Sequence, residues 1–218
     1  MAIKTRCLGV IILTTLLWSA CENPTSSDTT PDEVVPVSIY DVIRQNGVMT
    51  YPSTMEIEGV LTGVGFGDWN AHIQSPGSNK GVNIRSVGKV PAGLASGDRI
   101  RVIFDEVQEW NNLLQVMTAT AQVSDVISSG NEIKFDVVTS ISSEMQGNVV
   151  RLNDVTIESE LNNASNGTIN GVAARNETRV TIAPGSYQYI QGVVGQYQDV
   201  TQLLLYDSTF SLGPIVDP

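Results

Sequence analysis

The sequence predicts an all-β protein that contains two small barrels in tandem, each accompanied by one short helix. Three observations support this prediction. From Val37 onward, apolar and polar residues mostly alternate, which is the pattern of strands with one buried and one wetter face. Two short segments interrupt the alternation with helical spacing, and each ends at a glycine. One motif also occurs twice, near the end of each half of the chain.

The first twenty residues have the pattern of a secretory leader. Lys4 and Arg6 form a basic start, and residues 8–18 supply an apolar run. A transmembrane helix needs about 20 apolar residues, so this run of about 11 is too short to span a bilayer. An ordinary leader explains the charge and the apolar run but not the cysteine that follows. Residues 17–21 (LWSAC) resemble a bacterial lipobox, in which Cys21 is acylated and becomes the mature N-terminus.

This resemblance implies a lipid anchor on Cys21 with palmitate-type chains, and two or three such chains hold a protein at a membrane almost permanently. The mature chain would then carry no free thiol, because Cys7 is removed with the leader; disulfides and thiolate metal sites are excluded. Residues 21–36 are rich in Pro and small polar residues, which is typical of a tether. We therefore expect a lipoprotein of the cell envelope, at the outer membrane or cell surface rather than the inner membrane.

Two short helices are predicted from apolar stripes. Ser38 is the expected N-cap of the first helix and Gly47 its expected stop, whereas the second helix is expected to end at Gly147. The stripes consist of Ile39, Val42 and Ile43 in the first helix and of Val138, Ile141 and Met145 in the second. Each helix is about two turns long, so each needs a barrel to pack against.

Strands are predicted where the period is two, as in residues 55–61, 82–84 and 100–104. Gly59 lies inside the first of these segments and has no side chain to pack. We expect a bend or a bulge at this position, of the kind found at barrel corners.

A repeat divides the folded part. Residues 107–116 align without a gap on residues 194–203, at an offset of 87. The matched positions include Trp110 with Tyr197 and Gln115 with Gln202. Chance similarity between strands of like composition is the alternative to a structural duplication. We expect one domain at residues 37–128 and a shorter, degenerate one at residues 135–212.

The size of each unit, one short helix and about five strands, is that of an OB-type barrel. Four segments of the first unit carry a more specific pattern: Ala71–Pro76, Gly81–Ile84, Leu94–Val102 and Trp110–Val116. Together they resemble the OB-fold domains of bacterial extracellular nucleases and surface lipoproteins. Ile190–Val194 and the Tyr197–Gln202 stretch resemble the end of the same pattern. These are turn and core positions, so the resemblance implies a fold more than an activity.

Few residues suit catalysis. His72 is the only histidine, and the alternation of its strand predicts an exposed position, without a second imidazole to complete a zinc site. Glu56 and Glu58 share one strand face, and residues 105–109 hold further acids. Paired carboxylates suit acid–base chemistry. Without an aromatic-rich cleft, however, we interpret them as solvated surface, with Ca²⁺ coordination there or at residues 68–70 as the alternative. We expect no enzyme, cofactor or metal site.

A basic segment stands out in an acidic chain. After the leader, the chain holds 23 acidic against 10 basic residues, a formal charge of −13, whereas residues 80–101 hold five basic residues and only Asp98. The candidate ligand-binding residues are Trp69, Lys80, Arg85, Lys89, Arg99, Arg101 and Trp110. Basic side chains beside aromatics are what OB barrels use for single-stranded nucleic acid. The alternative is that these charges only solubilise the protein and that Trp69 and Phe66 pack under a loop.

The sequence therefore favours a non-catalytic binding or scaffolding protein at the cell envelope, with an envelope protein or a glycan as its partner. The alternative is single-stranded nucleic-acid binding by the basic face of the first barrel, as an accessory to extracellular nuclease activity. The acidic surface elsewhere would repel phosphate, which disfavours this alternative.

Overall fold

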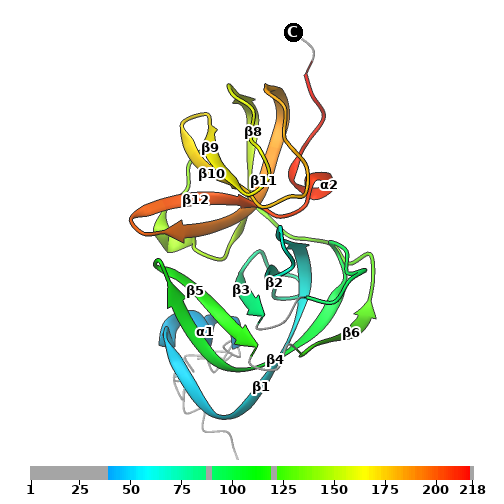
Figure 1. Ribbon diagram of the computed structural model, residues 1–218, viewed down its shortest axis with the longest axis vertical. Helices are drawn as coiled ribbons and strands as arrows, with labels where there is room; N and C mark the ends of the chain where they lie inside the picture. The colour runs from blue at the N-terminus through cyan, green and yellow to red at the C-terminus, as the bar shows by residue number, and fades with distance from the viewer. Residues whose placement is uncertain (1–38, 87–89, 119–121, 217–218) are drawn as a thin grey trace, which may run out of the picture. The chain divides into compact units, whose positions relative to one another are not determined.

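The computed structural model describes residues 39–86, 90–118 and 122–216; the leader, Cys21, the tether and Lys89 lie outside the described residues. Val37–Pro218 form one compact unit. The all-β prediction is confirmed, because this unit is built from two six-stranded sheets (Figure 1). In the described part of the chain, no helix is long and apolar enough to cross a membrane.

The first sheet closes into a barrel. Its strands are β1 (Met49–Val64), β2 (Asn70–Gln74), β3 (Gly81–Ser86), β4 (Arg99–Trp110), β5 (Leu113–Thr118) and β6 (Gln122–Ser128). They are ordered β1-β2-β3-β5-β4-β6, and β1 also pairs with β4, so five strands form a closed ring with β6 on its side. The β3–β5 pair is parallel, and the neighbouring pairs are antiparallel.

The second sheet repeats most of this pairing pattern. Its strands are β7 (Asp136–Val137), β8 (Val149–Ile157), β9 (Ser165–Ile169), β10 (Val172–Asn176), β11 (Gly185–Tyr197) and β12 (Val200–Leu205). Their order is β7-β8-β11-β12-β10-β9, and the β10–β12 pair is parallel, as β3–β5 is in the first sheet. In the described residues, however, β8 does not pair with β9 as β1 does with β2. Each sheet encloses its own apolar core.

The first predicted helix is present as α1 (Ile39–Asn46), and Gly47 ends it by donating its N–H to the carbonyl of Ile43. Tyr40 and Ile43 are fully buried against the first barrel. Of the two alternatives predicted for Gly59, the bulge is wrong, because the β1–β4 register is regular there and the β1–β2 irregularity lies between Leu61 and Gly63; the next residue, Val60, pairs with both β4 and β2. A Cβ on Gly59 would lie 2.3 Å from the Tyr40 hydroxyl, so this glycine lets α1 approach the strand.

The second predicted helix is wrong in extent. Only Ser143–Met145 form a helical turn, the 3₁₀ turn η1. The segment before it pairs with the sheet instead of forming a helix. β7 pairs with β8, and the N–H of Val138 donates to the carbonyl of Arg151. A short α-helix, α2 (Ser208–Ser211), follows the last strand instead, and the Asp207 side chain caps it.

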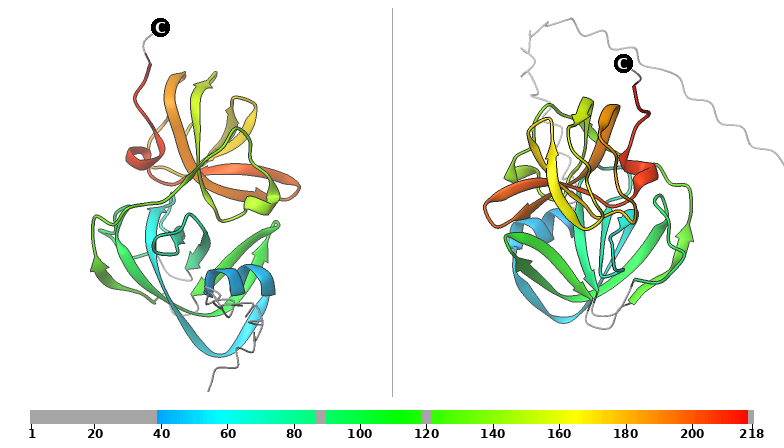
Figure 2. Two further views of the ribbon diagram at one scale, coloured as in Figure 1. Left: turned by 180° about the vertical axis from the view of Figure 1, so that it is seen from behind. Right: turned by 45° about the horizontal axis from the view of Figure 1, so that its top comes forward.

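The two sheets are joined by buried contacts. Gly147 accepts hydrogen bonds from Gly81 N at 2.9 Å and from the His72 ring at 3.0 Å, and its backbone has a φ of +79°. A third apolar cluster joins residues of β5, β8, β11 and β12; its buried members are Leu113, Val149, Val193, Leu204 and Tyr206. The tips of the β4–β5 and β11–β12 hairpins lie side by side (Figure 1 and Figure 2), where Gln198 N donates to Asn111 O at 2.7 Å.

Candidate ligand cleft between the barrels

A cavity of about 510 Å³ lies between the two sheets. We call it the cleft. Its walls come from β3, β5 and the end of β4 on one side, and from β10, β12 and the end of β11 on the other. The polar and aromatic residues that line it are Asn70, Asn83, Arg85, Gln108, Trp110, Gln115, Asn166, Arg175, Glu177, Gln196, Tyr197, Gln202 and Tyr206. This volume is in the range of ordinary small-molecule sites, about 300–1,000 Å³.

Strand alternation places the same residue type on each wall. In β5, Val116 belongs to the first core whereas Gln115 lines the cleft. In β12, Leu203 belongs to the second core whereas Gln202 lines the cleft. The two glutamines are the matched pair of the sequence repeat, so the repeat brings equivalent side chains to opposite walls.

The register of the parallel strands extends this equivalence to two arginines. Arg85 of β3 pairs with Met117, two residues after Gln115, and lines the cleft. Arg175 of β10 pairs with Leu204, two residues after Gln202, and also lines it. Each arginine therefore occupies the same position in its own sheet.

Each of these arginines is held by an asparagine of the neighbouring strand. Arg85 pairs across β2–β3 with Asn70, and its Nη1 donates to Asn70 Oδ1 at 2.7 Å. Arg175 pairs across β9–β10 with Asn166, and its Nη1 donates to Asn166 Oδ1 at 3.3 Å. The walls differ in charge, because Arg175 also forms an ion pair with Glu177.

Two aromatic side chains stand at the hairpin ends of the cleft. Trp110 and Tyr197, which the repeat also matches, are 59% and 40% exposed. Their ring centroids are 5.8 Å apart with an interplanar angle of 63°, an edge-to-face contact. Asn112 Nδ2 donates to Gln198 O at 2.9 Å, which holds the two hairpin tips together. Two amphipathic rings are thus kept at the surface of the cleft.

The side chains of Gln115 and Gln202 have no protein partner among the described residues. Gln115 is 7% exposed and Gln202 6% exposed. Among the residues that the structure describes, no protein group forms a hydrogen bond with either side-chain carboxamide. Neither carboxamide is among the fully enclosed polar atoms that lack a partner, so both are open to the cavity and can form hydrogen bonds with solvent or a ligand there.

A further polar pair of the cleft lining joins the two sheets. Tyr206 Oη donates to Asn83 Oδ1 at 2.9 Å, which links the end of the second sheet to β3. Burial, helped by the negative charge of Glu177, raises the pKa of Tyr206 well above its ordinary value. The phenol therefore stays protonated and keeps donating at all physiological pH values.

The structure separates the seven candidate residues of the sequence. Arg85 and Trp110 line the cleft, whereas Trp69 is exposed on the β1–β2 connection and does not line it. Lys80 forms an exposed ion pair with Asp41, with Nζ and Oδ1 3.1 Å apart. Lys89 lies outside the described residues.

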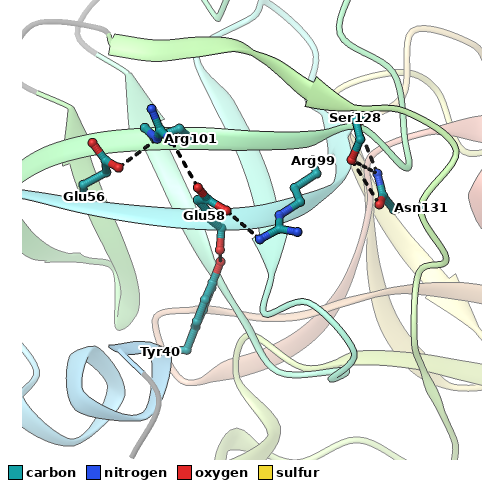
Figure 3. Close-up of polar contacts among 7 residues, drawn as sticks. All are labelled: Tyr40, Glu56, Glu58, Arg99, Arg101, Ser128 and Asn131. Carbon is teal, nitrogen blue, oxygen red and sulfur yellow. Dashed lines mark hydrogen bonds and ion pairs between the residues drawn. The ribbon is translucent and has the colours of Figure 1, made fainter.

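Arg99 and Arg101 share one face of β4, but this face is not free for phosphate (Figure 3). Glu58 of β1 accepts from Arg99 at 2.6 Å and from Arg101 at 3.2 Å, and Glu56 lies 2.8 Å from Arg101. The hydrogen bonds from Arg101 and Arg99 hold the pKa of the Glu58 carboxyl below its ordinary value. The carboxylates interpreted as solvated surface thus neutralise the predicted basic face.

The prediction that His72 is exposed is wrong. Its side chain is fully buried, because β2 is covered on its outer face by the segment around Gly147. The carbonyl of Gly147 can only accept, so His72 Nε2 carries the proton and Nδ1, 2.9 Å away, accepts from Thr62 Oγ1. Burial lowers the pKa of His72 from 6.5 to about 3. The ring is a neutral structural link.

The acidic groups considered for Ca²⁺ are dispersed. Asp68 forms an ion pair with Arg179 of the second half, and the Asn70 side chain accepts from Arg85. Within the described ranges, no three His, Cys, Asp or Glu side chains gather closely enough to hold a metal ion.

Sequence reasoning missed most of the cleft. Gln115, Gln202 and Tyr197 were visible as matched positions of the repeat, but a repeat does not say that its copies face each other. Arg175 and Asn166 carry no sequence signal, since only the strand register relates them to Arg85 and Asn70. Comparison with family models, with curated protein sequences and with solved structures found no match to this chain.

Proposed function

We propose that this chain is a non-catalytic binding protein of the bacterial cell envelope, anchored by lipid on Cys21 and binding its ligand in the cleft between two OB-like barrels. The observation that carries the proposal is the duplicated polar set around the cleft. Two glutamine carboxamides without a protein partner among the described residues face a cavity that lies between two equivalent walls. Each can donate to and accept from a ligand in this cavity.

Strand order supports the OB-like architecture. The ring β1-β2-β3-β5-β4, closed by β1–β4 pairing, has the order of a five-stranded Greek-key barrel of the OB type. The second sheet has the corresponding order β8-β11-β12-β10-β9. The expected nuclease-associated ancestry and the lipid anchor remain proposals that rest on sequence motifs.

The chemistry of the cleft supports binding rather than catalysis. Carboxamides neither gain nor lose protons near neutral pH, and the one carboxylate of the lining, Glu177, is paired with Arg175. The only imidazole, His72, does not line the cleft, and both of its ring nitrogens form hydrogen bonds elsewhere. The side chains can hold and orient a ligand.

Binding of single-stranded nucleic acid is the second candidate. The observation that favours it is that Arg85, which has no carboxylate partner among the described residues, shares the cleft with the stacking side chain of Trp110. The ion pairs of Arg99 and Arg101 leave this candidate with less positive surface than the sequence alone indicated.

Thermal unfolding of the full chain, purified in detergent, tests the binding proposal. The ligand panel comprises neutral oligosaccharides, single-stranded DNA and RNA, and envelope-derived peptides. We expect one class to raise the melting temperature of the wild-type chain and not that of a Gln115→Met/Gln202→Met variant. The proposal is wrong if no class shifts the wild-type chain, or if the shift is equal in the variant.

Metabolic labelling with a palmitate analogue tests the anchor separately. We expect labelled chain in the membrane fraction, and unlabelled chain in the Cys21→Ala variant. Equal labelling of both would contradict lipidation at Cys21.

A further inference from the structure

The cleft offers groups that suit hydroxyls. A carboxamide donates through its NH₂ and accepts through its oxygen, and a sugar hydroxyl likewise does both. Gln115 and Gln202 are more than nine-tenths buried, line the cavity from opposite walls and have no hydrogen-bonding partner in the described part of the protein. Their donors and acceptors are both left available to a ligand in the cavity.

Trp110 and Tyr197 add an apolar surface that suits the C–H face of a sugar ring. Trp110 and Tyr197 are held at the hairpin ends by edge-to-face contact, and each exposes a large part of its ring system. One face of a pyranose ring presents C–H groups, which pack on an aromatic ring while the hydroxyls point outward. Apolar packing and hydroxyl recognition are thus available within one cavity.

Charge disfavours a polyanion. The lining has two guanidinium groups, and Glu177 neutralises one of them. The chain as a whole has a formal charge of −11, so a ligand with many phosphates would be repelled as it approached. A neutral ligand is not repelled by the negative charge of the chain and does not need a strongly basic lining.

The duplication indicates a ligand with repeating units. Equivalent Arg–Asn pairs, glutamines and aromatics stand on the two walls, at positions fixed by strand register. A polymer of similar residues can present the same hydroxyl pattern to both walls. Building on the proposed binding role, we infer that the cleft binds a short neutral oligosaccharide, with sugar rings against Trp110 and Tyr197 and hydroxyls bonded to Gln115 and Gln202.

Isothermal titration of the full chain in detergent tests this inference. The probes are cello-, malto-, xylo-, manno- and chito-oligosaccharides, with oligogalacturonate as the anionic sugar and single-stranded DNA as the polyanion. We expect saturable binding of at least one neutral sugar. Loss of one well-placed hydrogen bond is expected to weaken it by about ten-fold in Gln115→Met and in Gln202→Met, and Trp110→Ala should weaken it at least as much.

Matched variants outside the cleft serve as controls. Gln188 is an exposed glutamine of β11, and Trp69 is an exposed tryptophan; neither lines the cleft. Gln188→Ala and Trp69→Ala should leave sugar affinity within about two-fold of wild type, well below the ten-fold change of a lost hydrogen bond. Near-ultraviolet circular dichroism shows whether each variant keeps its fold.

The outcomes separate this inference from the wider proposal. Sugar binding that the cleft variants do not weaken, or no binding of any neutral sugar, overturns the inference. If DNA binds instead and the cleft variants abolish that binding, the cleft is a binding site but its ligand is not a sugar. If galacturonate alone binds and Arg85→Gln abolishes it, the assignment of a neutral ligand is wrong.

Discussion

Gln115 and Gln202 contribute to the cleft more than to the fold. Each carboxamide lacks a protein partner among the described residues and is open to the cavity, so no internal hydrogen bond depends on it. Methionine has a similar length and volume and no amide. We expect Gln115→Met to leave the free energy of unfolding of the ligand-free chain within about 0.5 kcal/mol of wild type, as measured by urea denaturation. A loss of stability in this variant would show that the side chain has a structural partner.

His72 gives the protein a pH dependence of stability. Its pKa is about 3 in the folded chain, against 6.5 for an ordinary solvated histidine, so the unfolded chain binds the proton more readily between these values. The stability that neutral His72 contributes is complete above pH 6.5 and is lost as the pH falls towards 3, at about 1.4 kcal/mol per pH unit.

We therefore expect His72→Gln to flatten the decline in unfolding free energy between pH 6.5 and about pH 5, a window above the ordinary titration of most carboxylates. Urea denaturation across this range measures the slope. An unchanged slope in His72→Gln would mean that other groups control the acid sensitivity.

The burial of His72 could not be predicted from its strand. Period two marks one face of β2 as core, and the outward face is normally wet; here Gly147 covers it. Likewise, the basic face was predicted on the correct strand, yet pairing with Glu58 required the β1–β4 register, which matches Glu58 with Arg101. Local patterns identify strands and turns, whereas contacts between distant segments decide which polar groups remain available.

At the scale of elements, β1 and β4 form a ladder of alternating charge. Glu56, Glu58, Arg99 and Arg101 neutralise one another on the barrel surface (Figure 3). Surface pairs of this kind contribute little to stability, typically about 0–1 kcal/mol, but they change the local potential.

We expect Glu56→Gln/Glu58→Gln to remove two negative charges from beside Arg99 and Arg101. Single-stranded DNA should then bind at low salt more tightly than to the wild-type chain, and addition of salt should reverse the gain. Fluorescence anisotropy with a labelled oligonucleotide measures it. The same affinity in variant and wild type would contradict the idea that these carboxylates mask the basic face.

Of the two predicted helices, the first is present and the second is mostly replaced by strand pairing. The apolar stripe of α1 is used as predicted, with Ile43 in the barrel core. The similar stripe at Val138, Ile141 and Met145 also packs against a core, but only its last turn is helical because pairing with β8 uses the start. A two-turn stripe specifies a buried face and leaves the backbone conformation to tertiary pairing.

At the scale of the whole molecule, the two sheets share a buried apolar cluster and a set of hydrogen bonds. The cluster that includes Val149, Val193 and Leu204 and the hydrogen bonds at Gly147 couple them. Tandem domains with independent cores can unfold separately, but shared contacts that stabilise both favour a single transition.

We expect calorimetry to show one unfolding transition, and Val193→Ala to lower the stability of the whole chain by about 2 kcal/mol. Two resolved transitions, with only the second shifted by Val193→Ala, would show that the two sheets are energetically independent and that the cleft walls are not fixed by these shared contacts.

The central claim is that the cleft receives a ligand between two equivalent walls. Tryptophan emission during titration of the Trp69→Phe chain with neutral oligosaccharides tests it most directly, since Trp110 is then the only tryptophan after residue 18. We predict a saturable blue shift as a sugar ring covers the exposed indole, and no shift in Trp69→Phe/Gln115→Met/Gln202→Met. A spectrum that stays constant through the titration, or shifts equally in both chains, would contradict the account.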